Sequence, residues 1–421
     1  MTRRTQGGMG RRLRNGSPEL YRVVAPFAQA IRRSLHVTLD TIDASRARKS
    51  LGSEPRDGDA PAPRIVLDGC GFQERFDGIT RVWTALMSEW SRSGFSRHVT
   101  VLDRGRTAPR MPGFAYVELP VVRAHDTAAQ RRLLEEVCRR ERADLFVSTS
   151  YSTPLATPSL LCVHDLTPET LGWDMDRPIW REKRRAIDRA SAYVCISQST
   201  AADLRRFYPD SGGRPLGVAL LGVDAVFRPT SEDEIRALLA DLDLPERYFV
   251  FLGHRDGYKN AALLFKAIPE FGADPGFGLL LVGGAPGLEP AFAEAARHVT
   301  VRIARLPDES LRAALSGAVA LLYLSRYEGF GLPILEAMAC GCPVIACRNS
   351  SIPEVAGDAP VYVGEDDAPG LAAAIRLLAG DAEAAERCRE KGFERARRFD
   401  WEATAAQIER FIREIAATPA P

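Results

Sequence analysis

The stretch SRYEGFGLPILEAMACGCPVI, residues 325–345, contains the pattern that decides the fold. An apolar run ends at Ser325, glycines at positions 329 and 331 free the backbone, and Pro333 stands in the first turn of a helical pattern. A buried strand that leads through a glycine-containing turn into a helix is the building unit of a parallel, doubly wound sheet. We therefore expect an α/β fold with a ligand at the turn where this strand ends.

The same alternation of short apolar runs and helical patterns extends outward from this stretch, beginning at residue 64. A polar, proline-containing region around residues 228–247 separates two series of runs. The predicted strands are RIVLDG (64–69), VTVLD (99–103), DLFVST (144–149), SLLCVHD (159–165) and AYVCIS (192–197) in the first series, and YFVFLG (248–253), FGLLLVG (277–283), VTVRIA (299–304), AVALLYLS (318–325) and CPVIAC (342–347) in the second.

This pattern predicts two doubly wound, Rossmann-like domains that face each other across a cleft. We place the N-terminal domain at residues 64–229 and the C-terminal domain at residues 230–398. A last helix follows over residues 399–417 and begins near Asp400 and Trp401.

Composition excludes several classes of function. The formal net charge of the 421 residues is only +1, which gives no reason to expect nucleic-acid binding. No apolar stretch approaches the ~20 residues that span a bilayer, and no signal peptide is recognisable. The 8 cysteines are scattered, mostly in apolar runs, which is typical of reduced thiols in a cytosolic protein. The sequence therefore predicts a cytoplasmic protein.

The first 63 residues differ from the rest and form a basic extension. Residues 1–50 carry 11 Lys and Arg against 3 Asp and Glu, and residues 52–63 resemble a linker. Apolar residues recur at helical spacing over residues 19–45. Such a helix can lie on the anionic inner membrane face, or it can pack on the body of the protein or on a partner protein.

Two acidic residues belong to the stretch quoted first. The start of the helix there offers unpaired N–H groups and a partial positive charge, which suits a diphosphate. Glu328 precedes that helix and Glu336 lies within it. Both carboxylates can accept hydrogen bonds from hydroxyls, Glu328 from a sugar and Glu336 from a ribose. The alternative is that both are solvated carboxylates that stabilise the helix dipole.

Basic residues mark a second turn between a strand and a helix, FLGHRDGYKNAALL, residues 251–264. Arg255 and Lys259 would stand at the helix start, where cations are unfavourable unless an anion lies between them. The alternative is a pair of surface cations.

The N-terminal half offers two further candidates. Gly78, in FDGITR (76–81), follows the first strand and would let the backbone approach a ligand closely, or it is a simple turn glycine. His164 ends a strand, and its position there favours a role in the site over a structural one.

Taken together, these segments resemble the retaining glycosyltransferases of family four, which have the GT-B fold. The resemblance covers roughly residues 64–415 and rests on motifs in the family's order. They are E-x7-E (Glu328 to Glu336) with EAMACGCPV, G-x-R-x-G-Y-K-N (253–260), VHDLTPE (163–169), RVW after DGIT, SSIPEV (350–355) and FDWEATA (399–405). The last is similar to the helix that returns to the N-terminal domain in that family. The pair Asp77-Gly78 departs from the two glycines that relatives often have.

The resemblance implies a role for each candidate. Arg255 and Lys259 resemble the pair that neutralises the donor diphosphate, which replaces a divalent ion, so no cofactor and no metal are expected. Glu328 resembles the residue that holds the donor sugar, Glu336 the ribose ligand, and His164 a histidine near the reacting sugar. The backbone N–H groups of Gly329, Phe330, Gly331 and Leu332 would assist Glu328. Three D-x-D triplets (57–59, 174–176 and 241–243) follow no predicted strand and read as ordinary acids.

We therefore expect a retaining, metal-independent glycosyltransferase that uses a nucleotide sugar. The GYKN form resembles a mannosyltransferase-rich subgroup, so GDP-mannose is the first choice of donor, ahead of UDP- and dTDP-sugars. The same resemblance implies a saccharide or lipid-linked acceptor in surface polysaccharide or lipopolysaccharide assembly. Alternatives are a nucleotide-sugar epimerase and a catalytically silent binding protein. A dinucleotide oxidoreductase is disfavoured because no predicted strand precedes a G-x-G-x-x-G.

Overall fold

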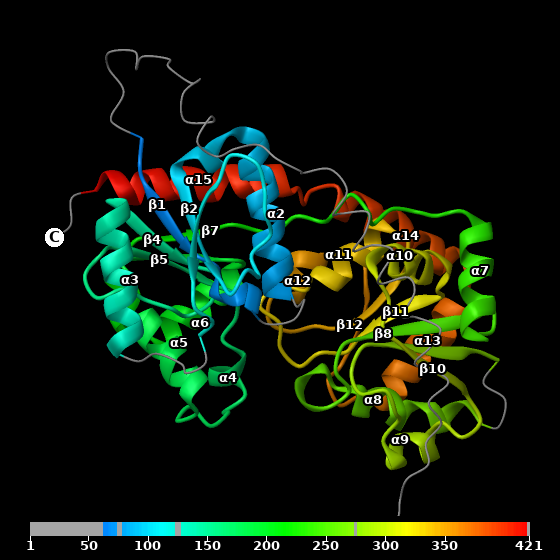
Figure 1. Cartoon of the computed structure of the whole chain (residues 1–421). Helices are drawn as coiled ribbons and strands as arrows, with labels where there is room; N and C mark the ends of the chain where they lie inside the picture. The colour runs from blue at the N-terminus through cyan, green and yellow to red at the C-terminus, as the bar shows by residue number, and fades with distance from the viewer. Residues whose placement is uncertain (1–61, 74–77, 123–127, 273–275, 419–421) are drawn as a thin grey trace, which may run out of the picture. The chain divides into compact units, whose positions relative to one another are not determined.

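The computed structural model describes residues 62–73, 78–122, 128–272 and 276–418 (Figure 1). Residues 62–421 form one compact unit. The basic extension up to residue 61, with the amphipathic helix expected over residues 19–45, lies outside the described residues. No helix in the described part of the chain is both long and apolar enough to cross a membrane.

The N-terminal sheet has seven strands, all parallel, in the order β3-β2-β1-β4-β5-β6-β7. Its order reverses between β1 and β4, where Ile65 pairs with Val99 on one side and Leu145 on the other. The strands are β1 (Ile65–Asp68), β2 (Val99–Arg104), β3 (Ala115–Leu119), β4 (Leu145–Ser148), β5 (Ser159–Val163), β6 (Ala192–Cys195) and β7 (Leu216–Val218).

The C-terminal sheet has six strands, also all parallel, in the order β10-β9-β8-β11-β12-β13. Its order reverses between β8 and β11. The strands are β8 (Tyr248–Leu252), β9 (Gly278–Val282), β10 (Thr300–Ala304), β11 (Ala320–Tyr323), β12 (Val344–Cys347) and β13 (Val361–Val363). The expected α/β class with two doubly wound sheets is confirmed.

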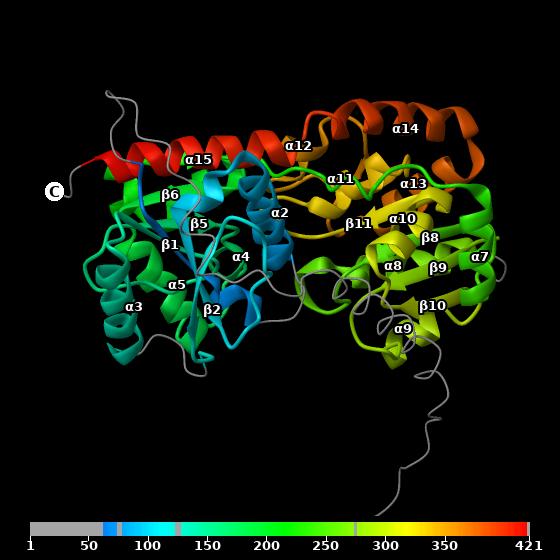
Figure 2. The same ribbon diagram turned by 45° about the horizontal axis from the view of Figure 1, so that its top comes forward.

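Helices cover both faces of each sheet (Figures 1 and 2). We call the N-terminal sheet with its helices the first domain and the C-terminal sheet with its helices the second domain. The first domain has α2 (Gly78–Ser93), α3 (Ala128–Glu141), α4 (Thr167–Thr170), α5 (Pro178–Arg189) and α6 (Gln198–Phe207). The second has α7 (Glu232–Leu242), α8 (Ala261–Ala267), α9 (Pro290–Ala295), α10 (Asp308–Gly317), α11 (Leu332–Ala339), α12 (Ile352–Ala356), α13 (Ala368–Gly380) and α14 (Ala382–Ala396), and α15 (Trp401–Ala417) follows.

Three strands escaped the sequence analysis: β3, β7 and β13. All three lie at an edge of their sheet, and their residues are half-buried or exposed. Strands of this kind lack the continuous apolar run that marks a strand buried on both faces. They add width to the sheets and leave the predicted order unchanged.

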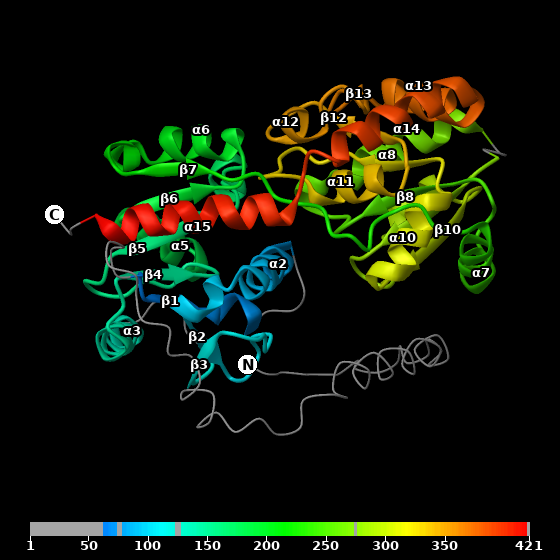
Figure 3. The same cartoon turned by 90° about the horizontal axis from the view of Figure 1, so that it is seen from above.

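Helix α15 lies along the first domain although it follows the second in sequence (Figure 3). Asp400 caps it by accepting from the backbone N–H of Glu402 at 3.1 Å. Its Ala405 carbonyl accepts from the indole of Trp90 in α2 at 3.3 Å, and Thr404 donates to the carbonyl of Leu220 at 2.7 Å. The helix therefore ties the end of the chain to the first domain.

The N-terminus of α6 contacts the second domain directly. Ser197 donates its hydroxyl to the carbonyl of Gly329 at 2.7 Å. The Glu354 carboxylate accepts from the backbone N–H groups of Gln198 at 2.8 Å and Ser199 at 3.2 Å. A carboxylate at a helix N-terminus satisfies orphan donors and the helix dipole together. This contact holds the two domains against each other beside the turn that precedes α11.

Candidate active site

The turn between β11 and α11 is built as its sequence predicted. Gly331 has a φ of +108°, which L side chains rarely adopt, and it immediately precedes α11. Pro333 stands in the first turn, where its missing N–H costs no hydrogen bond. The backbone N–H of Ile334 donates to the carbonyl of Gly331 at 3.0 Å, so an anion would be bound by the N–H groups that precede Ile334.

Lys259 and Glu328 meet across the point where the strand order of the second sheet reverses. Lys259 follows β8 and Glu328 follows the neighbouring β11, so both lie at the carboxyl ends of adjacent parallel strands. Lys259 Nζ donates to Glu328 Oε1 at 2.6 Å, with side chains only 17% and 11% exposed. Burial lowers the pKa of the ammonium, but the adjacent carboxylate more than offsets this and raises it. Lys259 is therefore held as a cation inside the site.

Two aromatic rings and a hydrogen bond to the backbone surround the Lys259–Glu328 pair. The ammonium of Lys259 lies 5.0 Å from the ring centroid of Tyr258 and 5.4 Å from that of Tyr323. The Ser350 hydroxyl accepts from the backbone N–H of Glu328 at 2.9 Å. Neither Tyr323 nor Ser350 was among the predicted site residues, because only the fold brings them beside Glu328.

Arg255 does not stand beside Lys259 as a second exposed cation. Its side chain is 1% exposed, and its Nε donates to Glu289 at 2.9 Å. Nη2 donates to the carbonyls of Ala285, at 2.9 Å, and Gly287. The guanidinium thus holds the segment between β9 and α9 in place, and its contact with a donor diphosphate stays a prediction.

Glu336 is held by a residue from the other domain. Its carboxylate, 6% exposed, accepts from Nη1 of Arg81 in α2, and Nη2 of the same arginine donates to Asp308 in α10 at 2.5 Å. Burial raises the pKa of Glu336 to about 7, against the lowering effect of Arg81. Arg81 and Asp308 were not predicted as site residues. The available signal was a cation in the first turn of a helix, where it opposes the dipole.

The contact of Gly329 with His164 explains why a glycine occurs at position 329. A Cβ there would lie 1.8 Å from the carbonyl oxygen of His164 and 2.9 Å from Cβ of Asp165. The Gly329 carbonyl in turn accepts from Thr200 at 3.1 Å, in addition to Ser197. The structure therefore brings His164, which is buried, next to the residue that follows Glu328.

Three further residues were predicted to contact the donor: Phe330, Leu332 and Gly78. Phe330 is buried, and its ring packs edge-on against Phe399 at 5.9 Å between centroids. Leu332 is partly buried against the same cluster. Gly78 is the exposed first residue of α2, and a Cβ there would meet nothing within 4 Å. Packing of the described residues therefore does not require a glycine at position 78.

No group of three His, Cys, Asp or Glu residues suited to a metal ion occurs among the described residues. The carboxylate of Asp174 accepts from the backbone N–H of Asp176 at 3.0 Å, as in an ordinary turn, and Asp243 follows the end of α7. The triplet at 57–59 lies outside the described residues. Metal independence stays a prediction.

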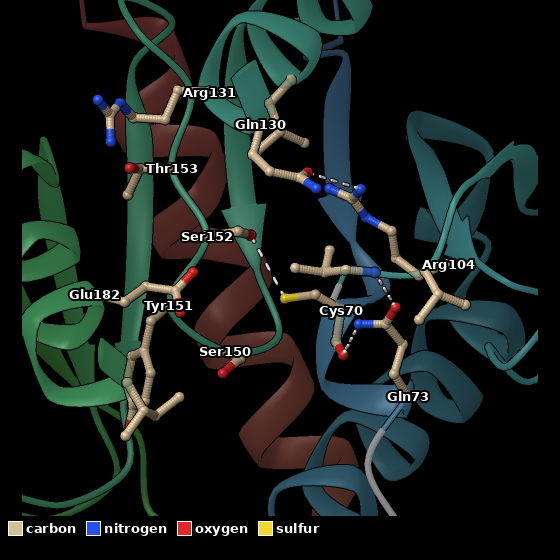
Figure 4. A pocket seen from close by; sticks show the side chains of 14 residues that line it. Cys70, Gln73, Arg104, Gln130, Arg131, Ser150, Tyr151, Ser152, Thr153 and Glu182 are labelled. Atoms are coloured by element: carbon tan, nitrogen blue, oxygen red, sulfur yellow. Dashed lines mark hydrogen bonds between the residues drawn. The ribbon is translucent and has the colours of Figure 1, made fainter. Parts of the chain in front are cut away.

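A separate pocket of about 220 Å³ lies within the first domain, at the point where its strand order reverses (Figure 4). Its walls come from the last residue of β2, from the segments that follow β1, β3 and β4, and from α3 and α5. The lining residues are Cys70, Gln73, Arg104, Val121, Val122, Gln130, Arg131, Leu134, Ser150, Tyr151, Ser152, Thr153, Ile179 and Glu182. This is the position that ligands prefer in open parallel sheets.

Arg104, which lines this pocket, forms a buried ion pair with Asp68. Arg104 donates to both carboxylate oxygens of Asp68, at 2.9 and 3.0 Å, and Ser152 donates to Asp68 at 2.7 Å. The thiol of Cys70 faces Ser152, and burial raises its pKa to about 12 (Figure 4). Such a thiol stays protonated and is no nucleophile. The hydroxyl and amide side chains of the pocket are suited to hydrogen bonding.

Comparisons with known proteins agree with this architecture. A family model described as Glycosyltransferase Family 4 matches residues 76–225, and one described as Glycosyl transferases group 1 matches residues 237–395. The O-antigen chain mannosyltransferase B of Escherichia coli is 27% identical over 256 residues, covering 58% of this chain and 67% of that protein. The alpha-maltose-1-phosphate synthase of Mycolicibacterium smegmatis is 30% identical over 289 residues, covering 62% and 74%.

A solved structure shows the same fold. Anabaena HepE in complex with UDP-glucose superposes with a TM-score of 0.64 at 16% identity, covering 83% of this chain and 99% of that one. Two facing parallel sheets with a site at the start of α11 define the GT-B class of glycosyltransferases. Within that class, the chain belongs to glycosyltransferase family four.

Proposed function

We propose that the protein transfers a sugar from a nucleotide diphosphate to a saccharide or lipid-linked acceptor, with retention of the anomeric configuration and without a metal ion. The observation that carries this proposal is the Lys259–Glu328 pair at the start of α11. It brings a cation from the turn after β8 beside a hydroxyl acceptor from the turn after β11, which leads into the N-terminus of α11. A diphosphate, a sugar hydroxyl and a ribose are the partners these groups would take.

The mechanism follows from where charge develops. When the anomeric bond breaks, the departing diphosphate gains negative charge. Lys259 and the N-terminus of α11 stabilise that charge, and Glu328 holds the sugar through its hydroxyls. The acceptor attacks from the face that the diphosphate leaves, and a donor phosphate oxygen takes its proton. No covalent bond to the protein forms, and His164 lies beside the reacting sugar.

Mannose from GDP-mannose is the donor that we propose. The GYKN motif and the Escherichia coli relative named as a mannosyltransferase support this choice. The HepE structure contains UDP-glucose, so UDP-glucose is the second donor to test.

The pocket of the first domain supplies the acceptor site in this proposal. The charged side chains in and directly behind its wall are two arginines, Arg104 and Arg131, and two acids, Glu182 and Asp68. Their charges sum to zero, and hydroxyl and amide groups such as Ser152 and Gln130 line the rest. A neutral, hydroxyl-rich ring fits this chemistry better than a phosphorylated one. Surface polysaccharide or lipopolysaccharide assembly in the cytoplasm, at the inner membrane face, is the corresponding process.

The first test is binding and slow hydrolysis of a panel of nucleotide sugars in EDTA. Wild type is compared with Glu328→Ala and with Glu383→Ala, which changes an exposed glutamate on α14. We expect one donor to bind without metal and to release free sugar, with loss only in Glu328→Ala. A strict requirement for a divalent ion, or binding of no donor, would overturn the proposal. NMR of the product must show the donor's anomeric configuration, since inversion contradicts the retaining mechanism.

Two alternatives are separated by the same assay. An epimerase converts the donor sugar without an acceptor, and a silent binding protein binds the donor without releasing sugar. The presence of both members of the Lys259–Glu328 pair at the α11 turn favours the transferase over the silent binder.

A further inference from the structure

The contact between Arg81 and Glu336 has a consequence for donor binding. One guanidinium from α2 reaches two carboxylates of the second domain, Glu336 in α11 and Asp308 in α10. Its side chain is 27% exposed and lies 5.5 Å from the ring centroid of Phe227. Arg81 thus links the two domains, because Nη1 donates to Glu336 and Nη2 donates to Asp308.

The neighbours of Glu336 would otherwise favour its neutral form. Asp308 from α10 and Asp224 from the segment before α7 are both negative and oppose ionisation of Glu336, as does burial. Tyr323 of β11 and Cys340 at the end of α11 are neutral groups with raised pKa values. Arg81 is the cation that contacts the carboxylate.

The cations on α10 and α14, the helices packed against α11, have other partners, and Arg312 on α10 donates to Glu234 at 2.9 Å. On α14, Arg389 donates to the carbonyl of Gly341, and Arg395 donates to the carbonyl of Val355. On α12, Glu354 accepts from the N-terminus of α6. Arg81 therefore carries the counter-charge for Glu336.

We propose that Arg81 is a positioning residue for the donor: it keeps Glu336 ionised and oriented, so that this carboxylate can accept the hydroxyls of the donor ribose. This inference rests on the proposed function. Arg81 contacts only Oε1 of Glu336, which leaves Oε2 and further lone pairs for hydroxyl donors. A protonated carboxyl would instead present an O–H to the same diol and lose acceptor capacity.

The same contact makes ribose recognition depend on the two domains being together. Arg81 belongs to the first domain and Glu336 to the second. If the domains part, Glu336 loses the guanidinium that balances its charge and orients it. The ribose site is therefore complete only while the two domains are in contact.

The test measures the affinity of GDP and of its 2′,3′-dideoxy analogue calorimetrically between pH 5.5 and pH 8.5. The terminal phosphate titrates in this range, so the difference between the two nucleotides isolates the ribose contribution. In wild type we expect this contribution to fall as the pH decreases through about 7, the pKa of Glu336. Arg81→Gln should move its midpoint upward by about one pH unit or more.

Two further variants make the test specific. Arg81→Lys retains the charge and should keep the midpoint closer to that of wild type. Asp308→Asn removes a negative neighbour of Glu336 and should move the midpoint downward, opposite to Arg81→Gln. Circular dichroism confirms that each variant is folded. If Arg81→Gln does not fold, the midpoints of Arg81→Lys and Asp308→Asn are compared with that of wild type.

An unchanged midpoint in Arg81→Gln would overturn the inference. Tighter ribose-dependent binding by Arg81→Gln than by wild type at every pH would also overturn the inference. Arg81 would then compete with the ribose for the Glu336 carboxylate. Either result leaves the proposed function intact when wild type still binds GDP. Failure of wild type to bind either nucleotide overturns the proposed function and, with it, this inference.

Discussion

The carbonyl oxygen of His164 occupies the space that a side chain at Gly329 would need, because a Cβ there would lie only 1.8 Å from that oxygen. His164 directly follows β5 of the first domain, and Gly329 follows Glu328 in the second. The close approach of the two domains is therefore built into the turn that carries the sugar-binding glutamate.

Gly329→Ala should separate the two domains at this point. We expect near-complete loss of transfer while circular dichroism shows both domains folded, because the backbone of His164 cannot yield as a flexible side chain would. Small-angle scattering and activity measure the two effects. The matched control is Gly380→Ala at the end of α13, where a Cβ meets nothing within 4 Å. Equal activity of both variants would contradict this account of Gly329.

Lys259→Ala should weaken donor binding through the diphosphate. A charge-assisted contact contributes roughly 1.5–3 kcal/mol, so calorimetry should show roughly ten- to hundredfold weaker binding of a nucleoside diphosphate. Lys391→Ala removes an exposed lysine paired with Asp358 and should leave binding unchanged. Similar affinities of the two variants would remove Lys259 from the donor site.

Glu336 should make the stability of the protein depend on pH. Its pKa is about 7 in the folded chain and about 4.5 in the unfolded chain. The folded state therefore binds this proton more tightly, so the contribution to stability is full below pH 4.5 and is lost as the pH rises towards 7. Glu336→Gln has no carboxylate to titrate, so its free energy of unfolding should not show this fall. Measured by urea unfolding, the difference in free energy of unfolding, variant minus wild type, should therefore increase between pH 4.5 and 7. A constant difference across that range would show that the pKa of Glu336 is not raised.

Arg104→Met should destabilise the first domain strongly. It leaves Asp68 buried without its bidentate partner, and breaking a buried pair typically costs about 3–5 kcal/mol. Arg387→Met breaks an exposed i,i+4 pair with Glu383 on α14 and should cost at most about 0.5 kcal/mol. Urea unfolding of the two variants measures the contrast. Comparable losses would mean that the Asp68–Arg104 pair is not shielded from water.

Much of the fold could be predicted because its signals are local. Ten apolar runs became ten strands, since a strand buried on both faces needs a continuous apolar run. Helices α11 and α15 begin within a residue or two of the predicted positions, where Gly331, Pro333 and Asp400 mark the starts. The edge strands β3, β7 and β13 were missed because these half-exposed segments carry no such run.

The candidate site was predictable only in part. The turn that carries Glu328 and the turn that carries Lys259 each have a recognisable local pattern, and their side chains do meet, because they follow adjacent parallel strands. Arg255 has the same local pattern as Lys259, yet its guanidinium turns to the carbonyls before α9. No local signal distinguishes these two cations.

The sequence by itself determined the class of fold, the two series of strands and the turns at their carboxyl ends, because periodicity, glycine and proline act on neighbouring residues. Only the tertiary structure decided which charges face each other. Arg81 and Glu336 are far apart in the chain, and their contact depends on how two separately folded sheets meet. The same packing decides why position 329 is a glycine, since the atom that excludes a side chain belongs to His164 of the other domain.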